Sequence, residues 1–419
     1  MNQEPVTRCH RLTSRRWRAG LSPSRSIAIH VLLAACLPMI PVAATSAVHG
    51  ANSPRQTTKA QDFALFDQRF GRADKGNSSA VQIIARARAA LARPVPPVPA
   101  PLTGPVQANT GMPAMPRPPA GGGPGSPGWR FGGGASALDL ALAWRLTGDR
   151  AYLDQASRYL DAWSTSYSWS LVSIQETGMD WVVLSYDLTR HDLPAAKRVK
   201  IESFIRRMTV EYLESIEKKT VPILPTLVNN WQSHRIKLVT LGAFELADPD
   251  LIARAHAIFS KQLAANLNSD GSTLDFHQRD ALHYVVYDLE PLLTAALVAK
   301  AHGEDWYHET SPTGSSLPHT LDWFSRFATG DEKHVEFVHS VVPIDKQRAD
   351  TGIKTYQPHE WEPVTSVRVF MLATLLDPRF QAVRDKLMAS ADDFTVADSP
   401  PNFDGPVFQA TWLTMLSKP

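Results

Sequence analysis

The sequence predicts an all-α fold in which antiparallel helix pairs pack in a ring or a superhelix. Apolar residues recur at helical spacing almost everywhere from Trp129 onward, and no alternating run of convincing length indicates a strand. Residue pairs typical of helix ends separate these runs, as at Gly148-Asp149, Asp248-Pro249 and Asp377-Pro378. Ten or more helices joined by short turns favour stacked helix pairs, and the lack of a fixed sequence period disfavours a regular repeat solenoid.

The apolar spacing places these helices in order along the chain. The predicted runs are about 138–146, 150–166, 173–190, 194–216, 229–247, 249–266, 279–302, 316–328, 361–375 and 378–391. A shorter helix over 80–93, with Val81, Ile84 and Leu91 on one side, is also expected. We place the domain at 129–419.

Composition and charge exclude several classes of protein. The chain has 419 residues, 43% of them hydrophobic, which is enough for a large core. Residues 1–47 hold six of the 43 basic and one of the 41 acidic residues, so the remainder carries 43 − 6 = 37 basic and 41 − 1 = 40 acidic side chains. A slightly acidic chain is not typical of nucleic-acid binders, and we expect no nucleic-acid partner.

The amino-terminal 47 residues have the pattern of a secretory signal. An Arg-rich start is followed by an apolar run from Ile27 to Ala47 that contains two prolines and ends in small residues, so a membrane span is not expected. This pattern predicts a periplasmic or secreted protein. Leu33 to Cys36 resembles a lipobox, which leaves a lipid anchor at Cys36 as an alternative. Both cysteines, Cys9 and Cys36, lie in this segment, so no thiol chemistry is expected afterwards.

Residues 48–128 are expected to be a largely disordered tether. The stretch 94–127 contains 12 of the 32 prolines and a glycine tract at 121–125. Such a composition favours extended polyproline conformations and buries little apolar surface.

The first candidate site segment runs from Leu227 to Arg235 and interrupts the apolar pattern with polar residues. Asn229 or Asn230 is a plausible helix cap. If the helix has begun by Asn230, then Asn230 and His234 lie four residues apart on one face. Spacing alone favours a capped helix with one hydrogen-bonded core histidine over a catalytic pair.

The second candidate segment spans 270–291, where ionisable and phenolic residues form two neighbouring stripes of a predicted helix. The stripes are Arg279, His283 and Tyr287, and Asp280, Tyr284 and Asp288. Burying both stripes would be costly unless they face a wet cleft. A core aromatic pair with solvated charges explains the spacing equally well.

These two segments together resemble the alginate lyase superfamily of polysaccharide lyases. The resemblance rests on Asn229-Asn230 followed by Trp231, Ser233 and His234, then Asp270-Gly271, Arg279, Ala281-Leu282 and Tyr284-Val285-Val286-Tyr287. Three segments agree with it, at Ala135 to Gly148, Tyr152 to Trp163 and Gln175-Glu176-Thr177-Gly178, so that it covers roughly 129–391. It implies an incomplete (α/α) toroid and an enzyme that cleaves an anionic, uronic-acid-containing polysaccharide by β-elimination. Trp231 stands where the alginate lyase branch has its catalytic His, so polyglucuronate stays open beside alginate.

β-Elimination requires groups of the kind found in these segments. The C5 proton of a uronate is barely acidic, so the enzyme must neutralise the carboxylate, remove the proton and protonate the leaving O4. With the resemblance, we assign Asn230 as the carboxylate neutraliser and His234 as the base or a second neutraliser. Tyr287 is assigned as the proton donor, with Tyr284 as its rival because the rotation of the helix is unknown.

The remaining candidates are expected to bind substrate. Arg279 would bind a substrate carboxylate, and the other substrate-binding candidates are Asn229, Arg235, His283 and Tyr284. The histidines outside this region lack metal-ligand spacing, so no metal and no other cofactor is expected.

Two rival functions remain open. A glycoside hydrolase on the same scaffold would use a carboxylate pair such as Asp270 or Asp275 with Asp280. A carbohydrate-binding protein without activity is the other, because a fold does not fix a function.

Overall fold

The computed structural model describes residues 64–66, 78–98, 106–107, 112–113, 134–218 and 225–391. The chain divides into residues 1–56 and 57–419, and all described residues lie in the second unit, whose fold is given by itself. The expected signal segment, Cys36 and most of the proline-rich stretch 94–127 lie outside the described residues.

The described part of the chain is almost entirely helical. Its α-helices are α1 (Ser78–Leu91), α2 (Gly134–Thr147), α3 (Arg150–Ser166), α4 (Ser173–Glu176), α5 (Asp180–Thr189), α6 (Ala195–Glu217), α7 (Asn230–Glu245), α8 (Pro249–Asn266), α9 (Leu274–Arg279), α10 (Leu282–Ala301), α11 (Leu317–Ala328), α12 (Pro343–Asp350), α13 (Val367–Leu376) and α14 (Gln381–Ala391). Short 3₁₀ turns are η2 (Thr177–Met179), η3 (Arg190–Asp192), η4 (Pro225–Leu227), η5 (Lys354–Tyr356), η6 (Pro363–Ser366) and η7 (Pro378–Phe380). Two antiparallel pairs of two-residue strands join β1 (Val106–Gln107) to β2 (Met112–Pro113) and β3 (Val335–Glu336) to β4 (His359–Glu360).

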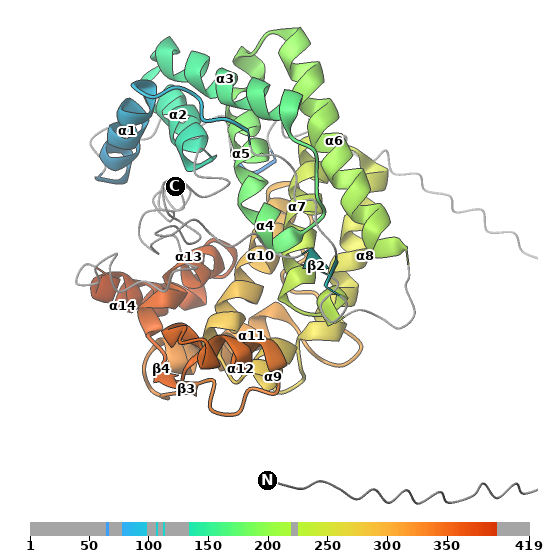
Figure 1. Cartoon of the computed structure of the whole chain (residues 1–419), viewed down its shortest axis with the longest axis vertical. Coiled ribbons are helices and arrows are strands. Elements are labelled where there is room, and N and C mark those ends of the chain that lie inside the picture. Colours follow the sequence, from blue (N-terminus) through green and yellow to red (C-terminus); the bar gives the residue numbers. More distant parts are fainter. Residues whose placement is uncertain are drawn as a thin grey trace, which may run out of the picture. The chain divides into compact units, whose positions relative to one another are not determined.

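The helices pair in two layers. One layer is formed by α2, α5, α7, α10 and α13, each of which packs against the next (Figure 1). On the other side, α3 packs on α2 and α5, α6 and α8 pack on α7, and α14 packs on α13. The fold is therefore an all-α toroid of helix pairs, and the predicted fold class is confirmed.

The predicted helix boundaries have the caps that their sequences indicate. The side chain of Asp149 accepts a hydrogen bond from the backbone N–H of Ala151 at the start of α3, and Asp248 caps α8 with Pro249 at the first helical position. Gly148 connects α2 to α3 with φ of 71°, a left-handed conformation that suits glycine.

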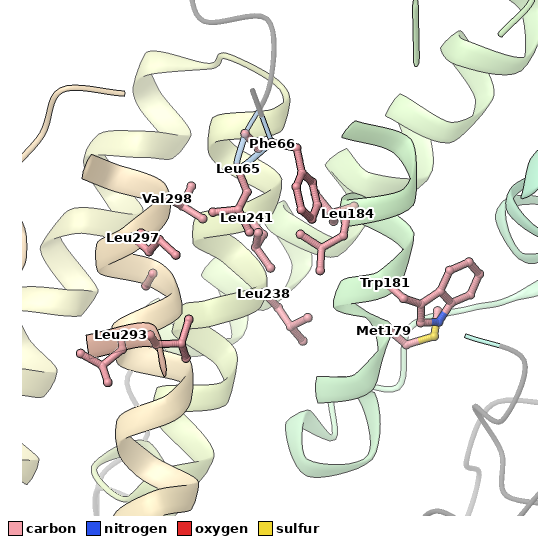
Figure 2. Close-up of a cluster of buried hydrophobic side chains, with 14 of the residues drawn as sticks. Leu65, Phe66, Met179, Trp181, Leu184, Leu238, Leu241, Leu293, Leu297 and Val298 are labelled. Carbon is pink, nitrogen blue, oxygen red and sulfur yellow. The ribbon is translucent and has the colours of Figure 1, made fainter. Parts of the chain in front are cut away.

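The core lies between the two layers and is densest around α7. Almost every residue of α7 is buried, because α6, α8 and α10 all pack against it. Figure 2 shows Leu238 and Leu241 of α7 between Leu184 of α5 and Leu293 and Leu297 of α10. Burial on all sides gives this helix a fixed rotation, which is a requirement for side chains that perform chemistry.

A short segment before α1 closes one end of this core. The backbone N–H groups of Ala64, Leu65 and Phe66 all donate to the carboxylate of Asp187 on α5, at 2.7, 3.0 and 2.9 Å. Leu65 and Phe66 then reach into the apolar cluster, where Figure 2 shows Phe66 beside Leu184. The folded unit thus includes residues well before the predicted boundary at 129.

Helix α1 also belongs to this unit. It packs against α2, and Arg86 on α1 makes two hydrogen bonds to Asp139 on α2, at 2.8 and 2.7 Å. The short helix expected over 80–93 therefore forms, and it is docked on the helical domain that was predicted to begin at 129.

Helix α10 is the one described helix that is long and apolar enough to cross a membrane. Within the fold, 78% of its most apolar window is buried. Its hydropathy is thus that of a core helix packed between α7 and α13.

Candidate active site

The start of α7 positions the paired asparagines. Asn229 is the N-cap, and its side-chain oxygen accepts a hydrogen bond from the N–H of Trp231 at 3.1 Å. Its backbone carbonyl also accepts from Gln262 Nε2 at 3.2 Å. Asn229 is therefore engaged in shaping the helix end, and Asn230 is the first residue of the helix itself.

Asn230 is held by a buried carboxylate from another helix. Asp275 on α9 accepts from the backbone N–H of Asn230 at 2.7 Å and from its Nδ2 at 2.6 Å. Asn230 is 1% exposed and Asp275 is fully buried. Burial raises the pKa of Asp275 to about 6, against the lowering effect of the nearby Arg279 and of the bonds from Asn230.

His234 lies one turn further along α7 and is also buried. Its Nδ1 shares a hydrogen bond of 2.6 Å with the hydroxyl of Thr177 in η2. Burial, and then the positive charge of Lys237, lower the pKa of His234 well below its usual value. At neutral pH this imidazole is therefore uncharged and able to accept a proton.

Tyr287 of α10 meets His234 across the α7–α10 interface. The two ring centroids are 4.2 Å apart and the rings are inclined at 55°. Tyr287 is partly exposed whereas His234 is 4% exposed. The phenol thus lies on the more accessible side of the pair.

The expectation of one helix carrying Arg279, His283 and Tyr287 in a single stripe is wrong. Asp280 has φ of 53° and ends α9, Ala281 is extended, and α10 begins only at Leu282. The left-handed residue turns the chain, so Arg279 leaves the stripe of Tyr287.

This break separates the environments of the two candidate tyrosines. The ring of Tyr284 lies under the guanidinium of Arg279, whose Cζ is 4.0 Å from the ring centroid. Its hydroxyl is 3.4 Å from that of Tyr356, and burial raises its pKa well above the usual value. Tyr287 contacts His234, whereas Tyr284 packs with a different set of residues.

Arg279 is already paired within the fold. It donates to Asp345 of α12, and its Nε lies 3.9 Å from Asp275. The side chain is 12% exposed. A guanidinium with these partners has little capacity left for a substrate carboxylate, and its position suits an internal support of Asp275.

His283 binds the β3–β4 strand pair to the start of α10. Its backbone N–H donates to Glu336 at 2.7 Å, and its Nδ1 lies 3.3 Å from the same carboxylate. His359 approaches Glu336 at 3.3 Å from the other strand. His283 and His359 therefore share the carboxylate of Glu336.

Arg235, the last of the expected substrate-binding residues, faces the loop before α7. Its Nη1 donates to the carbonyl oxygen of Thr226 at 2.5 Å and to Gln232 at 3.3 Å, and the side chain is 8% exposed. Arg235 therefore anchors the start of α7 to the preceding loop.

Three residues near the site carry contacts that spacing did not reveal. Thr177 bonds to His234, and Lys237 holds Thr177 by donating to its carbonyl at 3.0 Å and to Asp180 at 2.7 Å. Asp275 holds Asn230. Lys237 could have been noticed in the sequence, because it is a charged residue in an otherwise apolar part of its helix. Thr177 and Asp275 could not, because they lie 57 and 45 residues from His234 and Asn230, their partners.

Comparisons with known proteins find a matching family model and solved structures of similar fold. The family model for alginate lyase matches residues 133–335, which include α2 to α11 and the residues Asn230, His234 and Tyr287. An alginate lyase from Bacteroides ovatus has a similar structure, with a TM-score of 0.54 and 14% identity over 83% of this chain and 97% of that one. Alginate lyase A1-III from Sphingomonas species A1 gives a TM-score of 0.46 and 16% identity over 65% of this chain and 79% of that one. No curated protein matches the chain significantly.

The helical toroid is thus the fold of a known polysaccharide lyase, and the matched family model covers the helices that carry the candidate site. Residues 133–335 are thus similar to the alginate lyase family, and the fold is shared with an alginate lyase of known structure.

Proposed function

We propose that this protein cleaves an anionic, uronic-acid-containing polysaccharide, alginate or polyglucuronate, by β-elimination at a site formed by Asn230, His234 and Tyr287. The contact between the imidazole of His234 and the phenol of Tyr287 carries the proposal, because it brings a proton acceptor and a proton donor together. Asn230 lies one helical turn away on the same helix as His234.

In the proposed reaction the C5–H bond of the uronate breaks and its electron pair forms a C4=C5 double bond as the C4–O4 bond breaks. His234 accepts the C5 proton, and the Tyr287 hydroxyl gives its proton to the departing O4. The Asn230 amide donates a hydrogen bond to the carboxylate, where negative charge develops. The products are an unsaturated uronate and a new reducing end, and proton transfer from the imidazolium to the phenolate restores the enzyme.

The electrostatic environment supports His234 as the acceptor. Its lowered pKa keeps the imidazole uncharged before substrate binds. A uronate carboxylate placed nearby then favours the imidazolium, because an opposite charge raises the pKa of a histidine. The buried site therefore gains basicity when the anionic substrate arrives.

A second assignment of roles leaves His234 as a hydrogen-bond donor to the carboxylate and gives both proton steps to Tyr287. His234→Gln separates the two assignments, since glutamine can donate a hydrogen bond but cannot serve as a base. Loss of activity to the level of His234→Ala supports the first assignment. Activity clearly above that level supports the second.

The carboxylates of the rival hydrolase reading are engaged elsewhere. Asp275 is fully buried and bound to Asn230, whereas Asp280 accepts from the backbone N–H of His339 at 2.7 Å and lies 3.3 Å from His334. The side chain of Asp270 is 62% exposed and accepts from the Ser272 hydroxyl at 2.5 Å. A pair of acids flanking a scissile bond needs both carboxyls free toward substrate, so these contacts favour elimination.

A substrate panel tests the proposal. The protein is incubated with alginate, polyglucuronate and a neutral glycan, and both ultraviolet absorbance and reducing ends are followed. A lyase produces unsaturated ends that absorb together with reducing ends. Reducing ends without absorbance would indicate a hydrolase, and neither signal with retained binding would indicate a binding protein.

We also propose that the protein is exported to the periplasm or beyond. The Arg-rich start, the apolar run and the small residues near Ala44 and Ala47 support it. Terminal sequencing of the active protein should give a first residue between 37 and 50. An intact Met1 on active cytoplasmic protein would overturn the proposal, and a lipidated Cys36 would replace cleavage after the small residues by anchoring.

A further inference from the structure

A chain of buried ionic groups runs beneath the start of α7. Asp345 on α12 binds Arg279 on α9, Arg279 lies 3.9 Å from Asp275, and Asp275 binds Asn230 on α7. Asp275 and Asp345 are 0% and 1% exposed, and the Arg279 side chain is 12% exposed. Burying these charges is costly unless each is paired, so their retention beside the site calls for a reason.

The contact with Asn230 has a consequence for its orientation. Both carboxylate oxygens of Asp275 are used, one for the backbone N–H and one for Nδ2 of the same residue. A carboxylate accepts hydrogen bonds only, so the amide nitrogen must face it and the amide oxygen must face away. One N–H of the Asn230 side-chain amide then donates to Asp275, and the direction of the second N–H is fixed by this bond.

That direction matters for the chemistry. An asparagine amide can present either a donor or an acceptor, and an acceptor turned toward a uronate carboxylate would repel it. A group that stabilises developing charge is effective only when it is fixed in advance. Two short hydrogen bonds that Asn230 donates to a fully buried acceptor provide that fixation.

We propose that Asp275 is a positioning residue of the elimination reaction, which fixes the Asn230 amide with one N–H directed to the substrate carboxylate, while Arg279 keeps Asp275 ionised. The inference rests on the proposed function and extends it to the residues behind the site. Arg279 accordingly acts through Asp275 and does not itself bind the polymer.

The groups that face Asp275 are consistent with this role. Arg279 on its own helix and His283 on α10 both favour its ionised form, and Asn230 on α7 stabilises that form by donating twice. The carboxyl of Asp288 on α10 also faces Asp275, and the charge of Asp275 contributes to raising the pKa of Asp288. The side chains of Ser233 and Asn266 donate hydrogen bonds to Asp288. Burial still raises the pKa of Asp275 to about 6. Protonation of Asp275 would place an O–H donor where the Asn230 N–H groups need an acceptor, so the amide is held in this orientation by the ionised form.

The test uses Asp275→Asn, which keeps the size of the side chain and can still accept from the Asn230 backbone. The new amide places its own donor opposite Nδ2 of Asn230, so the Asn230 amide turns over. We expect kcat/KM to fall about 10- to 100-fold with a folded protein, because a misdirected catalytic group costs on that order. Asp250→Asn, which removes an exposed carboxylate on α8, is the matched control. It should change neither kcat/KM nor the fraction of folded protein.

Two readouts separate positioning from a purely structural role. The loss caused by Asp275→Asn should largely disappear when it is measured in an Asn230→Ala background, since both act through one amide. The acid limb of the kcat/KM profile near pH 6 should also disappear in Asp275→Asn. An equal loss in both backgrounds with an unchanged acid limb would overturn the proposal.

The same experiment distinguishes failure of the inference from failure of the proposed function. Wild-type protein that forms no unsaturated ends on any polyuronate would reject the lyase activity itself. An active wild type with Asp275→Asn at full activity would reject the positioning role alone.

Discussion

The imidazole of His234 and the phenol of Tyr287 lie 4.2 Å apart between ring centroids, although 53 residues separate them in the chain. The contact exists because α7 and α10 pack side by side along the layer of α2, α5, α7, α10 and α13. Each of the two helices is buried along most of its length, which fixes the rotation that brings the rings together.

Asn230 and His234 should act as one unit. Each replacement by alanine is expected to lower kcat/KM by about 10² to 10³, the loss typical for one oxyanion donor. Because the Asn230 amide stabilises the charge that develops as His234 removes the C5 proton, both groups act in one step, and the double variant should lose clearly less than the product of the two single losses. Steady-state kinetics of the three variants measures this.

The melting temperature of His234→Ala is the control for that series. A core histidine without a catalytic role would lower the melting temperature and leave the turnover of the folded fraction near normal. Such a result would remove His234 from the mechanism.

Thr177 should matter through His234. Thr177→Val removes the hydroxyl bonded to Nδ1, and we expect about a tenfold lower kcat/KM, equivalent to one hydrogen bond of about 1.4 kcal/mol. Thr177→Ser keeps the hydroxyl and should restore most of the activity. Thr240→Val is the matched control, since this buried threonine of α7 has no hydrogen-bond partner for its hydroxyl among the described residues. Equal activity of Thr177→Val and Thr240→Val would exclude the role of the Thr177 hydroxyl.

The β3–β4 pair should give the folded protein a pH dependence. Burial alone would raise the pKa of Glu336, but the charge and hydrogen bonds of His283, with the bond from His359, lower it to about 2 from 4.5. The hydrogen bond to Glu336 also raises the pKa of His359 above 6.5. The carboxylate's contribution is complete above pH 4.5 and is lost as the pH falls toward 2, while that of His359 is complete below pH 6.5 and is lost as the pH rises through its raised pKa.

Melting temperatures of wild type and Glu336→Gln between pH 3 and 9 check this prediction. The difference between the two proteins should be largest between about pH 4.5 and 6.5, where both contributions are present. Glu332→Gln, at an exposed ion pair with Arg326, serves as the control. A difference that does not vary with pH would contradict the assigned ionisation states.

Phe66 should contribute to stability from outside the predicted domain. It is fully buried among α5 and α7 residues, so Phe66→Ala should cost about 3–5 kcal/mol of unfolding free energy. Val81→Ala on the exposed side of α1 should cost less than about 0.5 kcal/mol. Denaturant unfolding of both variants measures the difference. Equal stability would mean that the segment 64–66 is not docked in solution.

Much of the fold could be predicted from the sequence because long amphipathic runs report directly on helices. The starts of α3 and α8 were marked by capping residues at Asp149 and Asp248. Helices α9 and α12 were not anticipated, since six and eight residues are too short to show a period. The left-handed Asp280 was equally invisible, and it is the residue that separates Arg279 from the stripe of Tyr287.

The candidate site could be predicted only in part for a related reason. Sequence spacing reports neighbours within one helix, such as Asn230 and His234, and the family resemblance adds Tyr287. Thr177 and Asp275 reach the site from other elements, and only the packing of η2 and α9 on α7 and its neighbours brings them there. Long-range pairs of this kind leave no periodic trace in one sequence.

In the proposed mechanism Tyr287, in contact with His234, delivers the proton to the leaving oxygen. The most direct measurement is the rate at which unsaturated ends form on the preferred polyuronate, compared for wild type, Tyr287→Phe and Tyr284→Phe. We expect Tyr287→Phe to lose about 10² or more in kcat, as for a removed general acid, with an unchanged melting temperature. Tyr284→Phe, whose hydroxyl pairs with Tyr356, should lose much less. The reverse ranking, or full activity of Tyr287→Phe, would contradict the assignment.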